Sequence, residues 1–190
     1  MIMIDAGHGG QDRGCAISSG LGSIDEADYA LSLARRLYGL TLGISGGCGL
    51  IRHADETIRL YERGMIAARN GASLLVSLHV DSRPEALRGL SCWHLPTCCH
   101  TAALAHRVYE LAPDKLRLPR GPGRARPVVS AGAEEWQQRG RAVLTAYATH
   151  GIDALLVEVG DCVGDREALL EIATQQQICA AIARALQEIT

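Results

Sequence analysis

Residues 73–79 constrain the fold of this chain more than any other segment. Ser73 to His79 is an almost continuously apolar run that ends in polar residues. Such a run suits a strand that is buried on both faces, as in parallel sheets that helices cover on each side. The segment therefore predicts an α/β fold.

Strand and helix signals alternate along the rest of the chain. Short apolar runs predict further strands at residues 1–5, 50–52, 89–95, 142–146 and 154–159. Apolar residues at helical spacing predict helices over residues 25–38, 57–69, 101–111 and 166–189, the last broken near Thr174. Residues 116–132 carry several prolines and glycines and are expected to form a surface loop. This alternation predicts a three-layer α/β fold, with a mainly parallel central sheet flanked by helices on both faces.

Length and charge limit the classes of partner. The 190 residues predict a single domain that spans residues 1–190. The formal net charge of −2 argues against nucleic-acid binding, which favours a basic excess. No uncharged apolar run approaches the roughly 18 residues of a membrane span, so stable membrane insertion is not expected.

The cysteines and the first residues bear on where the chain is made. Seven cysteines are an odd number in a chain too large for a disulfide scaffold, which favours reduced thiols. The first strand begins at Met1, without the basic region and cleavage site of a signal peptide. We therefore expect synthesis in the cytoplasm without a signal peptide.

A histidine flanked by glycines follows the first strand. His8 lies between Gly7 and Gly9, and its small neighbours leave room for a metal, a water and a substrate. Glycine-rich turns after strands are also common without any function. We interpret the segment as part of a functional site.

Three more polar side chains are expected near His8. His79 and Glu158 close two apolar strands, and Glu26 stands in the first turn of the first helix. Ligands gather at the carboxyl ends of strands in such sheets. Two histidines and a carboxylate are a ligand set for catalytic zinc, and a second carboxylate suits a general base. Taken singly, a histidine at a strand end is more often structural, and a glutamate in a first turn often only complements the helix dipole.

Five segments in order resemble the motifs of the type-3 zinc-dependent N-acetylmuramoyl-L-alanine amidases. These are peptidoglycan hydrolases of bacterial wall remodelling and of phage endolysins. The matching segments are residues 4–14, 26–28, 51–70, 77–81 and 156–160. Ile51 stands where the family usually has Thr, and Val80 where it usually has Ala. After Glu158 the chain reads Val-Gly-Asp-Cys where the family often continues Thr-Gly-Phe, a departure on the substrate side of the pocket.

The resemblance implies a mechanism and a substrate. His8, Glu26 and His79 would hold one Zn²⁺ per chain and leave a position for water. Glu158 would act as the catalytic base and pass the proton to the leaving amine. The bond cut would be the amide between N-acetylmuramic acid and L-alanine of peptidoglycan.

The resemblance also implies a setting for the enzyme. A single catalytic domain without a separate wall-binding domain suits a phage-type endolysin that works as a monomer. Such an enzyme is made in the cytoplasm and acts on the cell wall and periplasm after release through a membrane lesion. Two other functions stay open: a zinc peptidase or amidohydrolase of the same fold that cuts another amide, and a non-catalytic wall-binding relative.

Other candidate residues carry weaker signals. Substrate contacts are possible at Arg120, Arg124 and Arg126 in the basic loop, unless that loop is simply solvated, and at the loop residues His53 and His150. A second metal site is conceivable among six residues that match no zinc-finger spacing and also suit an ordinary strand and helix start. These are Cys92, His94, Cys98, Cys99, His100 and His106.

Overall fold

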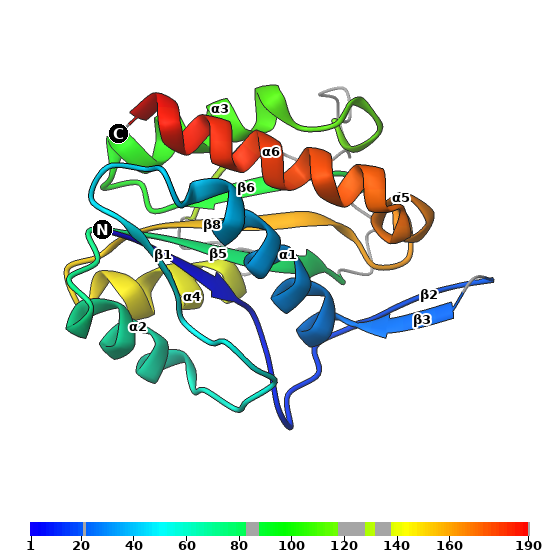
Figure 1. The fold of residues 1–190 in the computed structure, drawn as a ribbon, viewed down its shortest axis with the longest axis horizontal. Coiled ribbons are helices and arrows are strands. Elements are labelled where there is room, and N and C mark those ends of the chain that lie inside the picture. Colours follow the sequence, from blue (N-terminus) through cyan, green and yellow to red (C-terminus); the bar gives the residue numbers. More distant parts are fainter. Residues whose placement is uncertain (21, 83–87, 118–127, 132–137, 190) are drawn as a thin grey trace.

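The computed structural model describes residues 1–20, 22–82, 88–117, 128–131 and 138–189, and in them one six-stranded sheet forms the centre (Figure 1). Its strands lie in the order β4 (Cys48–Leu50), β1 (Ile2–Ala6), β5 (Leu74–Asp81), β8 (Asp153–Asp161), β6 (Ser91–His94) and β7 (Val128–Ser130). The first four run parallel, and β6 runs antiparallel to β8 but parallel to β7. The predicted mainly parallel sheet is confirmed.

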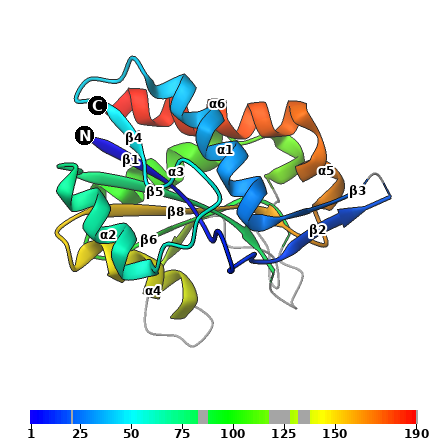
Figure 2. The same cartoon turned by 60° about the horizontal axis from the view of Figure 1, so that its bottom comes forward.

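Helices cover both faces of the sheet, as predicted. One face carries α1 (Glu26–Thr41), α3 (Cys99–Leu111) and α6 (Ile172–Ile189), and the other carries α2 (Leu60–Arg69) and α4 (Gln138–Ala148) (Figures 1 and 2). The short helices α5 (Arg166–Leu170) and η1 (Asp114–Leu116) complete the described helices. A hairpin of β2 (Ala16–Ser19) and β3 (Gly22–Asp25) extends away from the sheet in both views.

The central strands are apolar on both faces because each face packs on helices. Ile4 of β1 and Val76 of β5 join the core beneath α1, α3 and α6. Their neighbours Met3 and Leu75 join the core beneath α2 and α4. Successive residues of a strand point to opposite faces, so a doubly covered strand has no polar face. This confirms the interpretation of residues 73–79.

The strand predicted at residues 142–146 is wrong, because this segment lies inside α4. Leu144 and Tyr147 are buried three positions apart, while Arg141 and Thr145 are exposed. Such a short apolar run does not separate strand from helix, and here the 3.6-residue period holds. The break in the last helix falls at Glu171, between α5 and α6, close to the expected Thr174.

Among the described residues, no helix is long and apolar enough to cross a membrane. The loop predicted over residues 116–132 is wrong at both ends, because Leu116 closes η1 and Val128–Ser130 form β7 beside β6. The hairpin of β2 and β3 carries no strong apolar alternation, so the sequence does not predict it.

All seven cysteines are free thiols in the structure. Cys92 and Cys179 are fully buried, and burial raises the pKa of the Cys179 thiol to about 12. We expect titration of the denatured protein, prepared without reductant and protected from air, to find nearly all seven thiols free. In the native protein the exposed Cys99 should react first, whereas Cys92 and Cys179 should stay protected. A fully reduced sample is the control, and two or more stable disulfides would contradict the expectation.

Candidate metal centre

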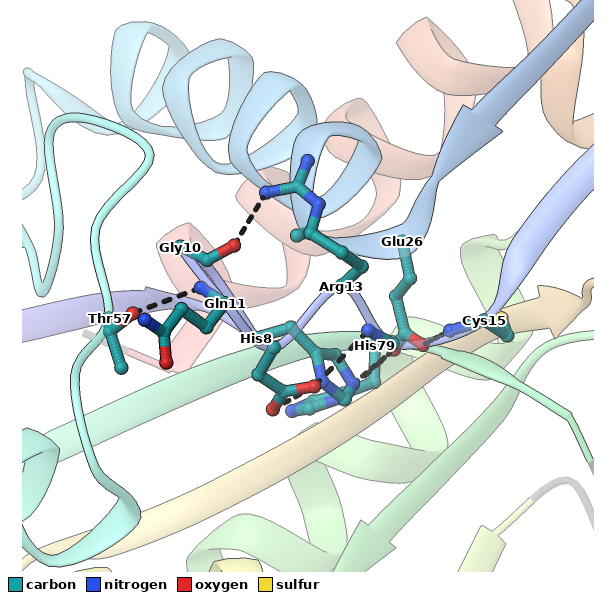
Figure 3. Close-up of polar contacts among 12 residues, drawn as sticks. His8, Gly10, Gln11, Arg13, Cys15, Glu26, Thr57 and His79 are labelled. Atoms are coloured by element: carbon teal, nitrogen blue, oxygen red, sulfur yellow. Dashed lines mark hydrogen bonds and ion pairs between the residues drawn. The ribbon is translucent and has the colours of Figure 1, made fainter.

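Two histidines and a glutamate from three separate segments meet near the edge where β1, β5 and β8 end. His8 follows β1, Glu26 begins α1 and His79 lies near the end of β5. One carboxylate oxygen of Glu26, Oε1, is 3.1 Å from His8 Nε2 and 3.1 Å from His79 Nδ1 (Figure 3). The two imidazole rings lie nearly edge to face, with centroids 5.0 Å apart. The structure therefore brings together all three residues predicted as metal ligands.

Glycines make this approach possible. A Cβ atom at Gly7 would lie 2.3 Å from His79 Cε1, and one at Gly14 would lie 2.5 Å from Glu26 Oε2. His8 itself has a φ of 58°, a left-handed conformation that non-glycine residues seldom adopt. Such strain persists where the surrounding structure enforces it, often at functional sites.

The loop after His8 is fixed by neighbouring polar groups. The Gln11 backbone N–H donates to Thr57 Oγ1 at 3.0 Å, and Arg13 donates to the Gly10 carbonyl at 3.2 Å (Figure 3). Asp55 accepts from the Gly10 N–H at 2.8 Å and pairs with Arg13. These contacts fix the loop and, with it, the position of His8.

The electrostatics of the three residues favour an ionised carboxylate. Burial alone would raise the pKa of the Glu26 carboxyl, but hydrogen bonds from His79 and His8 hold it well below its usual range. The backbone N–H groups of Cys15 and Val80 also donate to Glu26, at 3.0 and 2.9 Å. Burial alone would lower the pKa of His8, but Glu26 and Asp12 raise it to about 8.

The donor set fits a metal ion. The ligand atoms of His8, Glu26 and His79 all lie within 4.8 Å of one another. Two nitrogens and one oxygen are ligands that divalent zinc accepts in open, three-residue sites. The two imidazoles stay partly open to solvent, with 23% and 16% of their side-chain surface exposed, so a further ligand can enter.

Glu158 lies beside this centre on the neighbouring strand. In the parallel pairing of β5 with β8, His79 is the direct partner of Glu158. Directly paired residues project from the same face of a sheet, on strands about 4.8 Å apart. Glu158 is half-buried and, like His79, sits two or three residues before its strand ends. The predicted base is therefore adjacent to a predicted ligand, on the same face.

The family of this chain is shown by its similarity to known proteins. The model of the N-acetylmuramoyl-L-alanine amidase family matches residues 2–188, almost the whole chain. The chain belongs to this family. The resemblance seen in its motifs is therefore confirmed.

Relatives agree with this assignment. The chain is 31% identical over 112 residues to the N-acetylmuramoyl-L-alanine amidase AmiA of Salmonella typhimurium. The aligned segment covers 58% of this chain and 37% of that protein. The chain is 32% identical over 85 residues to the endolysin of Bacillus phage SPP1, covering 44% of this chain and 30% of that protein. The chain spans from 22% to 48% of the length of such curated relatives.

A solved structure shows the same fold. The N-acetylmuramoyl-L-alanine amidase AmiC2 of Nostoc punctiforme superposes with a TM-score of 0.76 at 24% identity. The match covers 98% of this chain and 94% of that chain. The architecture of the family is thus shared over almost the full length of both chains.

A buried ion pair supports the loop that carries His8. Asp5 Oδ1 lies 2.5 Å from Arg63 Nη1, and its other oxygen accepts from Ser77 Oγ at 2.9 Å and from the Tyr147 hydroxyl at 2.6 Å. Arg63 also donates to the His8 carbonyl at 2.5 Å. The guanidinium therefore links the core under α2 and α4 to the backbone of His8, a predicted metal ligand.

Arg52 joins the two segments that carry His8 and Glu26. Its guanidinium is 1% exposed and donates to the carbonyls of Ala6 and Gly7, both at 2.9 Å, and of Ala27 at 2.7 Å. The sequence assigns no role to Arg52 or Arg63, which lie in the matching segment 51–70. Their carbonyl partners arise from tertiary structure, so no local pattern could reveal them.

Loss of the buried Arg63 guanidinium should lower the stability of the fold considerably. We expect Arg63→Met to lower the free energy of unfolding by about 3–5 kcal/mol, because it leaves the Asp5 charge buried without its partner. Urea unfolding followed by circular dichroism measures the change. Arg69→Met, at an exposed position of the same helix, is the matched control and should change stability by about 0.5 kcal/mol or less. Equal stabilities of the two variants would contradict the role of Arg63.

The remaining candidates lie elsewhere. His150 precedes β8, at the opposite end of that strand from Glu158, and its ring lies 4.9 Å from that of Tyr61 on α2. This position, against α2, is away from the predicted metal centre. Arg120, Arg124 and Arg126 fall outside the described residues, so their contact with substrate stays a prediction. The exposed His53 contributes its backbone carbonyl to a hydrogen bond with Arg35.

Proposed function

We propose that this chain hydrolyses the amide bond between N-acetylmuramic acid and the L-alanine of the peptidoglycan stem peptide. One observation carries the proposal: His8, Glu26 and His79 converge on one point, with Glu158 the direct strand partner of His79. Membership of the amidase family supports the substrate class.

We further propose that the bound ion is one Zn²⁺, held by His8, Glu26 and His79. The set of two nitrogens and one oxygen, with solvent access left at the histidines, is typical of catalytic zinc sites. A zinc ion there would polarise the scissile carbonyl and lower the pKa of the attacking water.

The side chains of the chain have separate tasks in this scheme. Glu158 accepts a proton from the attacking water and delivers it to the nitrogen of the leaving L-alanine. Asp12 Oδ2 lies 2.9 Å from His8 Nδ1, and this ion pair keeps the imidazole oriented with Nε2 toward Glu26. Arg52 and Arg63 hold the backbone of the same segment through its carbonyls.

For the place of action we propose the cell wall and periplasm. The chain would be made in the cytoplasm and reach the wall through a membrane lesion, as a monomer. Its similarity to a phage endolysin supports this setting.

Digestion of purified sacculi tests the reaction. Mass spectrometry of the soluble products should find free stem peptides that begin with L-alanine, and glycan strands that keep intact muramic acid. Peptides cut at another amide would support a different amidohydrolase of the same fold. Binding to sacculi without any released peptide would identify a non-catalytic relative.

A further inference from the structure

A second group of metal-binding side chains lies outside the amidase centre. Cys98, His100 and Asp153 each present one ligand atom, and these atoms all lie within 4.8 Å of one another. Cys98 and His100 stand at the start of α3, whereas Asp153 is the first residue of β8. Residues 55 positions apart in sequence are thus brought to one point by the antiparallel pairing of β6 with β8.

The three side chains are not engaged elsewhere. Within the part of the chain that the structure describes, none of them forms a side-chain hydrogen bond or ion pair. In the amidase centre, by contrast, Glu26 is hydrogen-bonded to both histidines. A thiol, an imidazole and a carboxylate that face one space without bonding each other leave that space for another occupant.

The spacing and the surroundings suit a cation. Zinc–ligand bonds of about 2.0–2.3 Å in tetrahedral geometry set the ligand atoms roughly 3.3–3.6 Å apart, so atoms within 4.8 Å of one another need to approach by at most about 1.5 Å. A cavity of about 170 Å³ adjoins the group and is lined by Thr97, Thr101 and Gly151 among others. It offers room for a water or small anion as fourth ligand.

We propose that Cys98, His100 and Asp153 bind a divalent transition-metal cation of the zinc class. Thiolate and imidazole favour such ions over Mg²⁺ and Ca²⁺, which prefer oxygen ligands. Cys98 binds as the thiolate, so its thiol proton is released to solvent when the ion enters. The bound ion joins the start of α3 to the start of β8.

This site is separate from the amidase centre. Asp153 precedes Glu158 by five residues on β8, which places it about 16 Å away along the strand. The two sites lie toward opposite ends of β8, because β6 runs antiparallel to β8 and ends where β8 begins. The second site therefore does not depend on the proposed hydrolytic function.

Cobalt titration of the full, metal-free chain tests the proposal. Cobalt bound by a thiolate shows a charge-transfer absorption in the near ultraviolet, and the amidase ligands His8, Glu26 and His79 include no thiol. We expect two equivalents of Co²⁺ per chain and a thiolate band. His79→Ala should lose one equivalent and keep the band, which separates this result from the fate of the amidase centre.

Variants at the second site complete the design. Cys98→Ser should lose the band and one equivalent, and serine at this helix N-cap position should preserve the fold. Cys99→Ser, at the exposed neighbouring thiol, is the matched control and should keep both. Asp153→Asn should weaken binding of the second equivalent by at least about tenfold, since even outer-shell losses cost 10–100-fold. No thiolate band in the parent chain, or a band that persists in Cys98→Ser, would overturn the proposal.

Discussion

Removal of the metal from the centre of His8, Glu26 and His79 should abolish release of stem peptides, and added Zn²⁺ should restore it. The three residues alone supply two imidazoles, each 3.1 Å from the same oxygen of Glu26, and a carboxyl group whose pKa these histidines lower. Nothing among them can lower the pKa of a water from 15.7 to about 7, which is what bound zinc supplies. Dialysis against a chelator, followed by metal analysis and a sacculus digest, measures the effect.

Two controls make this experiment specific. Mg²⁺ should not restore activity, because it prefers oxygen ligands in near-octahedral geometry. The activity of the Cys98→Ser variant should fall on chelation and return with zinc as in the parent, since Cys98 lies near the start of β8, away from the amidase centre. Full activity in metal-free protein would show that the centre has another role.

Glu158→Gln should reduce turnover by about 10²–10⁴-fold, the usual contribution of a general base, with zinc still bound. The amide keeps the size of the side chain beside His79 but cannot accept the proton. Initial rates on sacculi and the zinc content of the same sample measure both halves of this expectation.

A matched control is available on the short helix that follows β8. Glu167→Gln alters an exposed carboxylate at the start of α5 and should leave both turnover and zinc content unchanged. A Glu158→Gln enzyme as fast as the parent would mean that another carboxylate takes the proton.

The sequence predicts those parts of the fold that depend on local periodicity. The doubly buried β5 and the helices α1 and α2 could be placed because their apolar spacing reflects which faces are covered. Residues 142–146 were misassigned because five apolar or small residues suit either period. The polar hairpin of β2 and β3 gave no periodic signal.

The candidate site shows the same division. His8, Glu26, His79 and Glu158 could be chosen from their places at strand and helix ends, and through the resemblance. The contacts of Arg52 with Gly7 and Ala27 depend on how distant segments pack. Asp153 likewise joins Cys98 and His100 only through the pairing of strands, so sequence reasoning considered the two residues without their third partner.

The hydrogen bonds from Arg52 and Arg63 to the carbonyls of residues 6–8 bear on how tightly the proposed Zn²⁺ would bind. A loop that needed to be ordered by the ion would lose conformational entropy on binding, about 1–2 kcal/mol for each residue fixed. Here the guanidinium groups fix the backbone on folding, and Arg52 sets the distance between the His8 and Glu26 segments. The backbone that carries the predicted ligands is therefore ordered before any ion binds, and binding of the proposed Zn²⁺ would lose less conformational entropy.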